Sequence, residues 1–306
     1  MIIAPGYIGI DVSKDDLDIF DDCTHRISNM AETIAAWLAE LPTPPRLVLF
    51  EATGRYDWQL QQQLHAAGIS FARVNPLHAR AFARATGQLA KTDAIDARLL
   101  AAMAQAFNPA PQRPDDPERL ELAELHRRRA QLVSYRQQER TRLHTASPSS
   151  APSIVSHLDW LDTQIKQLER QIETLIRSST ALTLAASLLR SIPSIGPVNA
   201  AGLLALMPEL GQRSAKTIAA LGGLAPINRD SGQFRGQRSI AGGRAEVRKL
   251  LYMAAVTASR SNSRFAETYK GLTANGKAAK LALIAVARKL LVTANAVLRS
   301  GQPFKA

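Results

Sequence analysis

Hydrophobic residues follow two different patterns along this chain, and the change from one to the other divides it. Up to about residue 110, short runs rich in Val, Ile and Leu alternate with longer stretches in which apolar residues recur at helical spacing. Beyond that point helical spacing dominates. Strands that alternate with helices predict an α/β domain, and the remainder predicts a mainly helical region, so the expected fold class is α/β plus α.

The first region is expected to begin with a hairpin and to continue with crossover units. We expect short strands within residues 6–28, with a turn at Ser13–Asp16, and then a helix that Asn29 caps and that ends at Leu41. The later elements are expected to be strand 46–51, helix 57–67, strand 69–74, helix 77–86 and the helix Asp93–Ala106. A hairpin followed by crossover units is the order of the ribonuclease H fold, which places carboxylates on its first strand, a later strand and a helix.

Two helical arms are expected after a Pro-rich linker at 108–117. They cover 118–145 and 154–177, with the Ser- and Pro-rich residues 147–152 between them. In the second arm, apolar residues form a seam whose spacing alternates between four and three: Ile154, Leu158, Leu161, Ile165, Leu168, Ile172 and Leu175. This spacing predicts a coiled coil. The seam closes either on the first arm or on another subunit, and we expect an intramolecular hairpin that also contacts a second chain.

The net charge of +12 is unevenly distributed over the 306 residues. Residues 1–110 hold 9 basic and 12 acidic residues, a net charge of −3, whereas residues 185–306 hold 18 basic and 4 acidic residues, a net charge of +14. Positive charge gathered in one region is typical of proteins that bind nucleic acid. An anionic membrane surface is the weaker alternative, because no basic amphipathic anchor is evident.

Cysteine usage and the N-terminus lead us to expect a cytoplasmic protein. The single cysteine, Cys23, excludes an internal disulfide framework and any cysteine-based zinc site. Residues 1–5 are too short and lack the basic start of a signal peptide, and no apolar run reaches membrane-spanning length. We therefore expect no membrane association.

Four acidic residues are candidates for one metal site. Asp11 ends an apolar strand, Glu51 follows another, and Asp93 and Asp96 lie three residues apart on one face of a helix start. An acid in the first turn of a helix often serves only the helix dipole, and one at a strand end is often only solvated. Asp11, however, follows a strand that we expect to be buried on both faces, where an unpaired charge is costly. A hard cation such as Mg²⁺ relieves that cost and binds oxygen ligands.

The basic last third of the chain contains two candidate sites for phosphate. The turn Ile192–Gly196 between two expected helices can present backbone amides to a phosphate, as a helix-hairpin-helix does, although an ordinary helix-helix turn has the same composition. Ser231 lies in a polar, Gly-rich segment and is a candidate nucleophile for a phosphodiester, with arginines to stabilise the charge. Ser-Gly is also an ordinary turn pair, and no histidine lies close in sequence to act as a base. The basic candidates for contact with nucleic acid are Lys91, Arg229, Arg235, Arg238 and Arg244.

Several short segments together resemble the successive motifs of the DEDD, or Piv-type, insertion-sequence transposases. They are Tyr7–Lys14, Glu51–Gly54, Val74–Pro76, Lys91–Arg98, Ile192–Gly196 and Ser231–Gly232. They cover nearly all of the chain in the same order as in that family. The resemblance implies a RuvC-like ribonuclease H catalytic domain at 1–110, a helical coiled-coil connector at 111–183 and a C-terminal transposase domain at 184–306.

The resemblance also implies a chemistry and a set of partners. Asp11, Glu51, Asp93 and Asp96 would bind Mg²⁺, and Ser231 would attack DNA to form a transient 5′-phosphoserine link. Members of this family are recombinases guided by a structured noncoding bridge RNA that pairs with target and donor DNA. They act as homodimers that assemble into a tetramer, in which the acids of one subunit meet the serine of another.

Three other functions remain open from the residues alone. The acids also fit a Mg-dependent junction-resolving nuclease in which water replaces Ser231 as nucleophile. A non-catalytic nucleic-acid-binding protein that keeps the fold is a second alternative. An actin-like sugar kinase or ATPase is a third, since Gly9–Ser13 also resembles its first phosphate loop, but the Arg-rich last third argues against it.

Overall fold

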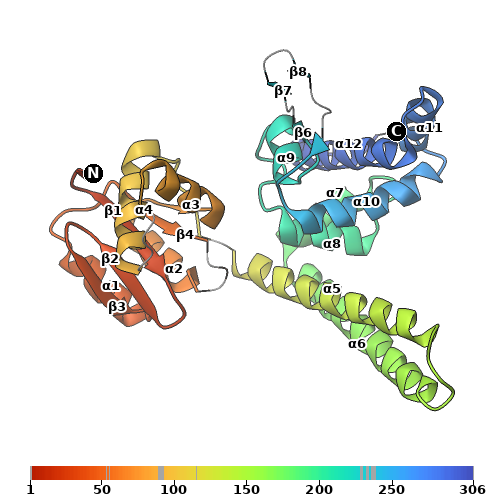
Figure 1. Cartoon of the computed structure of the whole chain (residues 1–306), viewed down its shortest axis with the longest axis horizontal. Coiled ribbons are helices and arrows are strands. Elements are labelled where there is room, and N and C mark those ends of the chain that lie inside the picture. The colour runs from red at the N-terminus through yellow and green to blue at the C-terminus, as the bar shows by residue number, and fades with distance from the viewer. Residues whose placement is uncertain are drawn as a thin grey trace. The chain divides into compact units, whose positions relative to one another are not determined.

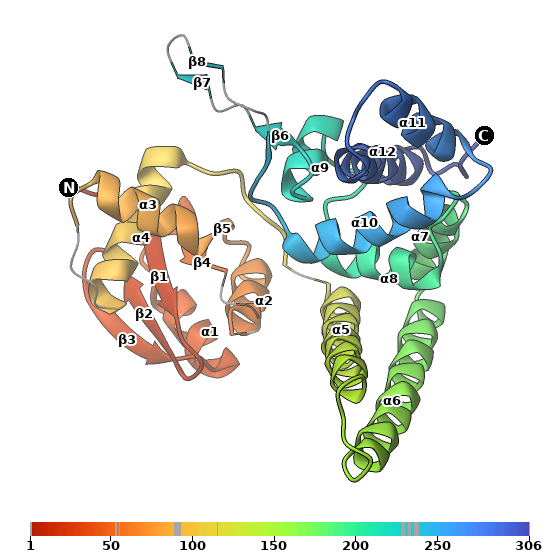
Figure 2. The same ribbon diagram turned by 45° about the vertical axis from the view of Figure 1, so that its right-hand side comes forward.

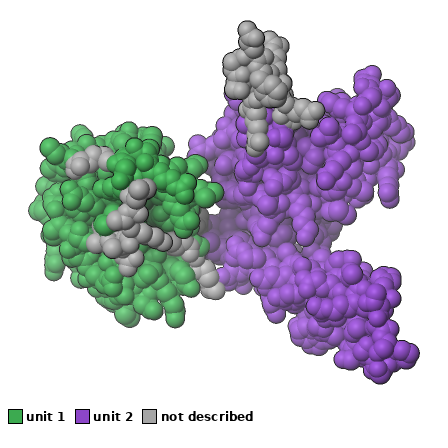
Figure 3. Space-filling model, viewed as in Figure 1, with its two compact units in different colours: residues 1–115 green, residues 116–306 purple. Residues whose placement is uncertain are grey.

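The protein folds into two compact units, residues 1–115 and 116–306, each with its own hydrophobic core (Figures 1 and 3). The computed structural model describes residues 2–52, 54, 56–88, 93–114, 116–227, 230–231, 234–235 and 239–305, and it describes only the backbone at 93–94, 230–231 and 234–235. The division into three domains at residues 110 and 183 stays a prediction.

The first unit is built on a five-stranded mixed sheet with the strand order β3-β2-β1-β4-β5. The strands are β1 Tyr7–Val12, β2 Asp16–Phe20, β3 Thr24–Ser28, β4 Leu47–Glu51 and β5 Phe71–Val74. The first three form an antiparallel meander, and β4 and β5 run parallel to β1. The helices are α1 Ala31–Glu40, α2 Trp58–Ala66, α3 Pro76–Ala85 and α4 Asp93–Phe107. The predicted order of strands and helices is confirmed, and it is consistent with a RuvC-like ribonuclease H fold.

Both faces of this sheet are buried, which explains why β4 is continuously apolar. Ile10 and Phe50 pack on one face against α1 and α2, and Phe50 stacks on Phe71 of β5 with ring centroids 5.7 Å apart. Leu49 packs on the opposite face with Leu100 of α4 and residues of α3. The two faces therefore differ in what covers them, and α4 covers the face of Leu49.

The expected role of Asn29 as a helix cap is wrong. The residue before α1 is Met30, and no side chain caps this helix. The side-chain amide of Asn29 instead donates hydrogen bonds to the carbonyl oxygens of Ser13 (3.0 Å) and Tyr56 (2.8 Å). Asn29 therefore ties together two loops that are distant in sequence, and local capping rules do not reveal such a contact.

The second unit starts with an antiparallel helical hairpin of α5 Pro117–Leu143 and α6 Ala151–Ser178 (Figure 2). Within it, Leu161 and Ile165 of the predicted seam pack against Leu132 of α5. The seam thus closes within one chain, and its contact with a second chain stays a prediction. Helix α6 begins three residues before the expected start, because Pro152 is accommodated in the first turn, where its missing N–H costs no hydrogen bond.

A bundle of six helices completes the second unit. They are α7 Thr180–Arg190, α8 Pro197–Leu206, α9 Ala215–Leu221, α10 Ala245–Ser259, α11 Arg264–Ala274 and α12 Ala279–Ser300. By length and composition α12 is apolar enough to cross a membrane. However, Val286, Leu290 and Leu291 of this helix are fully buried in the core of the bundle, as expected for a core helix.

Four short strands lie between α9 and α10, where the sequence predicted only a polar, Gly-rich segment. Strand β6 Pro226–Ile227 pairs with β9 Ser239–Ile240, and β7 Asp230–Ser231 pairs with β8 Phe234–Arg235. Both pairs are antiparallel. Ser231 therefore lies in a strand pair within the segment between α9 and α10.

Candidate active site

The parallel register of β1 and β4 brings Asp11 and Glu51 together. Gly9 pairs with Leu49 and Ile10 with Phe50, so the next positions in register are Asp11 and Glu51. Neighbouring strands lie about 4.8 Å apart, and residues level with each other on parallel strands point to the same face. Because Gly9 and Leu49 face α4, Asp11 and Glu51, two residues further on, face the same side of the sheet.

Helix α4 packs directly on β1, and its acids Asp93 and Asp96 lie in its N-terminal part. A Cβ atom at Gly9 would lie 2.0 Å from the carbonyl oxygen of Ala97 and 2.3 Å from the nitrogen of Ala101, so only glycine allows this approach. Near the start of the chain, the N–H of Ala4 donates to the Gln105 side chain of α4 at 2.7 Å. Helix α4 therefore runs opposite to β1, and its first turn lies towards the end of β1 that carries Asp11.

Asp96 immediately precedes Ala97 and so belongs to the turn of α4 that reaches β1. Asp93 is the first residue of α4, one turn earlier, and its side chain lies outside the described part of the structure. Asp11, Glu51 and Asp96 are half-buried, and none of the three is without an interaction partner. Half-buried carboxylates on neighbouring elements repel each other unless a cation joins them, and their oxygens suit a hard divalent ion. The acids present therefore fit a divalent metal.

A fifth acid, Asp18, lies beside Asp11 and was missed by the sequence argument. Asp18 pairs with Asp11 across β1 and β2, and the residue is 8% exposed. Arg26 of β3 binds it through two hydrogen bonds, from Nε to Oδ1 and from Nη2 to Oδ2, each 3.0 Å long. Like charges directly opposite each other destabilise a sheet, and Arg26 offsets that repulsion. The alternation of Asp16–Phe20 could have indicated Asp18, but only once the hairpin register was known.

The structure describes the predicted basic and nucleophilic residues only in part. Lys91, Arg229 and Arg238 are outside the described residues. Ser231 and Arg235 are placed by their backbone alone, in β7 and β8, where Ser231 pairs with Phe234. Their roles in catalysis and nucleic-acid binding stay predictions.

Arg244 forms an ion pair within the bundle. Its two terminal nitrogens donate to the two carboxylate oxygens of Glu209, at 2.7 Å and 2.6 Å. Burial alone would raise the pKa of Glu209, but the hydrogen bonds and charge of Arg244 outweigh it and hold the pKa below its ordinary value. This pair ties the start of α10 to the loop after α8, and a contact of Arg244 with nucleic acid stays a prediction.

The turn expected to bind phosphate joins α7 and α8, as the sequence indicated. Ile192 and Ile195 are almost fully buried in the core, and Ser194 between them has a positive φ of 69°. Gly196 and Pro197 then begin α8. The two isoleucines anchor the turn, while its binding of phosphate stays a prediction.

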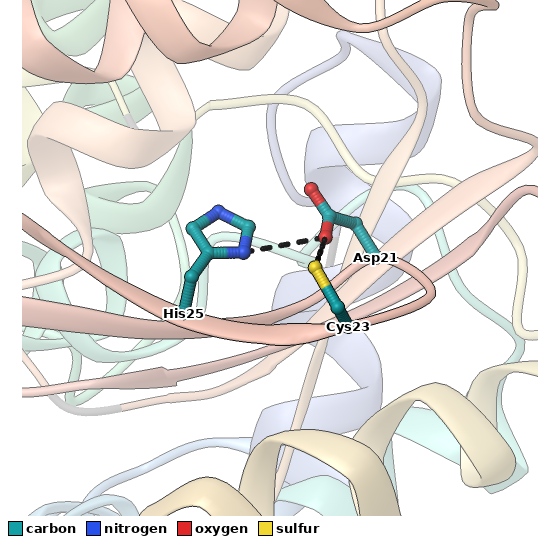
Figure 4. Close-up of side chains that lie close together, drawn as sticks. All are labelled: Asp21, Cys23 and His25. Atoms are coloured by element: carbon teal, nitrogen blue, oxygen red, sulfur yellow. Dashed lines mark hydrogen bonds and ion pairs between the residues drawn. The ribbon is translucent and has the colours of Figure 1, made fainter.

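A separate group of possible metal ligands lies at the turn between β2 and β3 (Figure 4). The ligand atoms of Asp21, Cys23 and His25 lie within 4.8 Å of one another, with His25 Nδ1 3.3 Å from Asp21 Oδ1. The other oxygen of Asp21 accepts a hydrogen bond from Trp37 Nε1 at 3.1 Å. These hydrogen bonds account for the arrangement of the turn. It lies at the opposite end of β2 from Asp16, away from Asp11.

Comparisons with known proteins agree over nearly the whole chain. Residues 8–146, which include the four acids, match a model of DEDD transposases of the IS110 kind, described as Transposase. Residues 186–270, which include Ser231, match the model described as Transposase IS116/IS110/IS902 family. The pilin gene-inverting proteins of Moraxella lacunata and Moraxella bovis are each 32% identical over 315 residues, which is 97% of this chain and 97% of each relative.

A third relative shares part of its length. The insertion element IS116 uncharacterized 44.8 kDa protein of Streptomyces clavuligerus is 32% identical over 150 residues, which is 47% of this chain and 36% of that protein. The full-length similarity to the two Moraxella proteins and the two matching family models lead to one conclusion. The chain belongs to the IS116/IS110/IS902 family of DEDD transposases and DNA-inverting enzymes, which act on DNA.

Proposed function

We propose that this enzyme cuts and rejoins DNA through a transient covalent bond between Ser231 and the 5′-phosphate of the cut strand. The acids Asp11, Glu51, Asp93 and Asp96 bind Mg²⁺ for this reaction. The observation that most supports the proposal is the pairing of Gly9 with Leu49 and of Ile10 with Phe50, the residues just before Asp11 and Glu51, where β1 contacts α4 through Gly9. Carboxylates so placed hold a cation next to a phosphate, and membership of a DNA-processing family supplies the substrate.

The proposed step balances without an external energy source. Ser231 Oγ forms a bond to the scissile phosphorus, and the bond from phosphorus to O3′ breaks. Ser231 loses one proton and the leaving O3′ gains one. The phosphoserine bond conserves the energy of the phosphodiester, so a new 3′-hydroxyl can reverse the step and rejoin the DNA.

The side chains of the site have distinct tasks in this reaction. Asp11, Glu51, Asp93 and Asp96 would hold the cation, which when bound would withdraw charge from the phosphate and favour ionisation of the serine hydroxyl. The arginines of the segment around Ser231 neutralise the phosphate oxygens as charge builds up. They are Arg229, Arg235 and Arg238.

We further propose that a structured noncoding RNA guides the choice of target and donor DNA, and that the enzyme acts as dimers joined into a tetramer. The net charge of +14 over residues 185–306 supports contacts to more than one polyanion. In such a system phosphate contacts supply affinity while base pairing supplies sequence choice. Active sites are shared, so the acids of one subunit act on the phosphate that Ser231 of another attacks.

The test is a denaturing gel of full-length protein with Mg²⁺, labelled DNA and RNA transcribed from the noncoding DNA that flanks the gene. We expect a protein-linked DNA band for the wild type and for the matched control Ser239→Ala. Ser239 is an exposed serine of β9, in the same segment between α9 and α10 as Ser231. The band is lost in Ser231→Ala and in Asp11→Asn. If Ser231→Ala cuts as well as the wild type and no linked band forms, water is the nucleophile and the enzyme is a nuclease.

Two further arms of this experiment address the partners. Omitting the RNA should abolish the linked band, and an unchanged band without RNA contradicts guidance. Mixing Ser231→Ala with Asp11→Asn should restore the band, because a site shared between subunits can combine the intact acids of one variant with the intact serine of the other. Failure to restore it contradicts shared sites.

A further inference from the structure

A cavity of about 580 Å³ lies in the second unit, between the helical hairpin and helices α7 and α8. Ile172 of α6, Ala186 of α7 and Ala200 of α8 contribute to an apolar lining. Basic side chains also line it, namely Arg129, Lys166, Arg170, Arg177 and Arg190. This size and this mixture are typical of sites for small organic groups.

A histidine with an unused polar atom lies in this cavity. His126 of α5 is 7% exposed, and its Nδ1 is buried without a hydrogen-bond partner among the described residues. Gly202 of α8 makes room for the ring, since a Cβ there would lie 2.7 Å from Cε1 of His126. A buried polar atom without a partner is costly, so packing and not a hydrogen bond through Nδ1 holds the ring in place.

The charge of the cavity favours an anionic ligand. Arg129 and Arg177 are paired with Glu169 and Glu173, at 2.7 Å and 2.5 Å. In the described part of the chain the other three cations, Lys166, Arg170 and Arg190, form no ion pair. The cavity thus combines apolar walls, one buried imidazole and three uncommitted positive charges. A nucleotide has matching features, with a flat base, polar base edges and phosphates.

We propose that this cavity receives one unstacked nucleotide of the bound nucleic acid, with its base beside His126 and its phosphates on Lys166, Arg170 and Arg190. The proposal rests on nucleic acid as the partner of the enzyme but not on Ser231 as its nucleophile. Burial, with the nearby Arg129 and Arg127, lowers the pKa of His126 to about 4. The ring is therefore neutral at pH 7, with one nitrogen to donate and one to accept a hydrogen bond.

The test is equilibrium binding of full-length Asp11→Asn protein, which removes cutting, to single-stranded oligothymidine and oligouridine. Each base-bearing strand carries one 2-aminopurine, and its matched strand is abasic at every position. We expect the base-bearing strand to bind at least about tenfold more tightly than the abasic one, with a change in 2-aminopurine fluorescence. The tighter of the two strand types identifies whether DNA or RNA enters the cavity. Equal affinity for base-bearing and abasic strands overturns the proposal.

Variants of the cavity separate its parts. Ser187→Trp and Thr183→Trp fill the cavity from exposed positions on α7, so both should abolish the preference for the base while leaving abasic binding unchanged. His126→Phe keeps the ring but removes its nitrogens, and it should have the same effect. Arg190→Gln should weaken both strands equally.

The matched control is Arg128→Gln, at an exposed position of α5 outside the cavity lining. It should leave the protein's preference for the base-bearing strand unchanged. If the tryptophan variants and His126→Phe all keep the full preference, the base binds elsewhere and the proposal is wrong. Because no cutting occurs in this assay, a failure of the serine mechanism leaves its result unchanged.

Discussion

Asp11 of β1 and Asp18 of β2 lie directly opposite each other in the antiparallel ladder, with both side chains on the face covered by α4. Asp18 is almost fully buried and is bound by Arg26, whereas Arg26 itself is about half exposed. Phe50 of β4 pairs with Ile10, so Glu51 and Asp11 are the next residues on these two strands, and three strands each contribute one acid to this region of the sheet. Arg26 compensates the charge of Asp18.

Replacing Arg26 by Gln should make the protein depend more strongly on a divalent ion. Without its partner the carboxylate of Asp18 adds negative charge beside Asp11, so we expect the free energy of unfolding in EDTA to fall by about 1–2 kcal/mol. Mg²⁺ should restore more stability to the variant than to the wild type, because it binds only the folded site. Urea unfolding with and without Mg²⁺ measures both effects. Arg80→Gln, at an exposed position of α3, is the control, and equal stabilisation of all three proteins by Mg²⁺ contradicts the prediction.

Gly9 should not tolerate even alanine. A methyl group there meets backbone atoms of Ala97 and Ala101 that no side-chain rotation can move, so α4 must shift away from β1. We expect a loss of about 2–3 kcal/mol in unfolding free energy and loss of DNA cutting, since Asp96 moves with the helix. The control is Gly271→Ala in α11, where a Cβ meets no atom within 4 Å and alanine favours the helix. Full activity of Gly9→Ala would mean that α4 does not position the acids.

These contacts show what the sequence could and could not predict. Continuous apolar runs predicted β1 and β4, and the acids that follow them were found because a charge after a buried strand is unusual. Asp18 was missed because its proximity to Asp11 depends on the hairpin register, which side-chain alternation alone does not fix.

Contacts between residues that are distant in sequence could not be predicted for the same reason. The sequence predicted Arg244 as one of the arginines that contact nucleic acid, and it did not reveal the ion pair with Glu209, which lies 35 residues away. The sequence also did not predict the burial of His126, because Gly202 of α8, which packs against its ring, lies far along the chain. Periodicity predicts elements and faces, whereas packing between elements determines which charges are paired.

The pair of Glu209 and Arg244 should stabilise the bundle in a pH-dependent way. The pKa of Glu209 is lower in the folded state than its ordinary value of 4.5, so its contribution is fully present above pH 4.5 and is lost as pH falls through the folded value. We expect Arg244→Gln to reduce the unfolding free energy by about 1–2 kcal/mol at pH 7, with the difference shrinking in more acidic solution. Urea unfolding at pH 7 and pH 3.5 tests this, with Arg248→Gln as a neighbouring control. A difference that is independent of pH would indicate lost packing instead.

His126 should also reduce the stability of the fold as the solution becomes acidic. Its pKa is 6.5 in the unfolded chain and about 4 in the fold, where burial disfavours the charged ring. Between pH 7 and pH 5 the imidazole takes up a proton in the unfolded chain but stays neutral in the folded chain. This group alone therefore lowers the free energy of unfolding by about 2 kcal/mol at pH 5. His126→Phe removes the effect, and its unfolding free energy should fall less than that of the wild type between these values.

The control for His126 is His144→Phe, at an exposed position at the end of the same helix, which should keep the wild-type dependence. Parallel curves for the wild type and His126→Phe would show that the imidazole becomes charged within the fold.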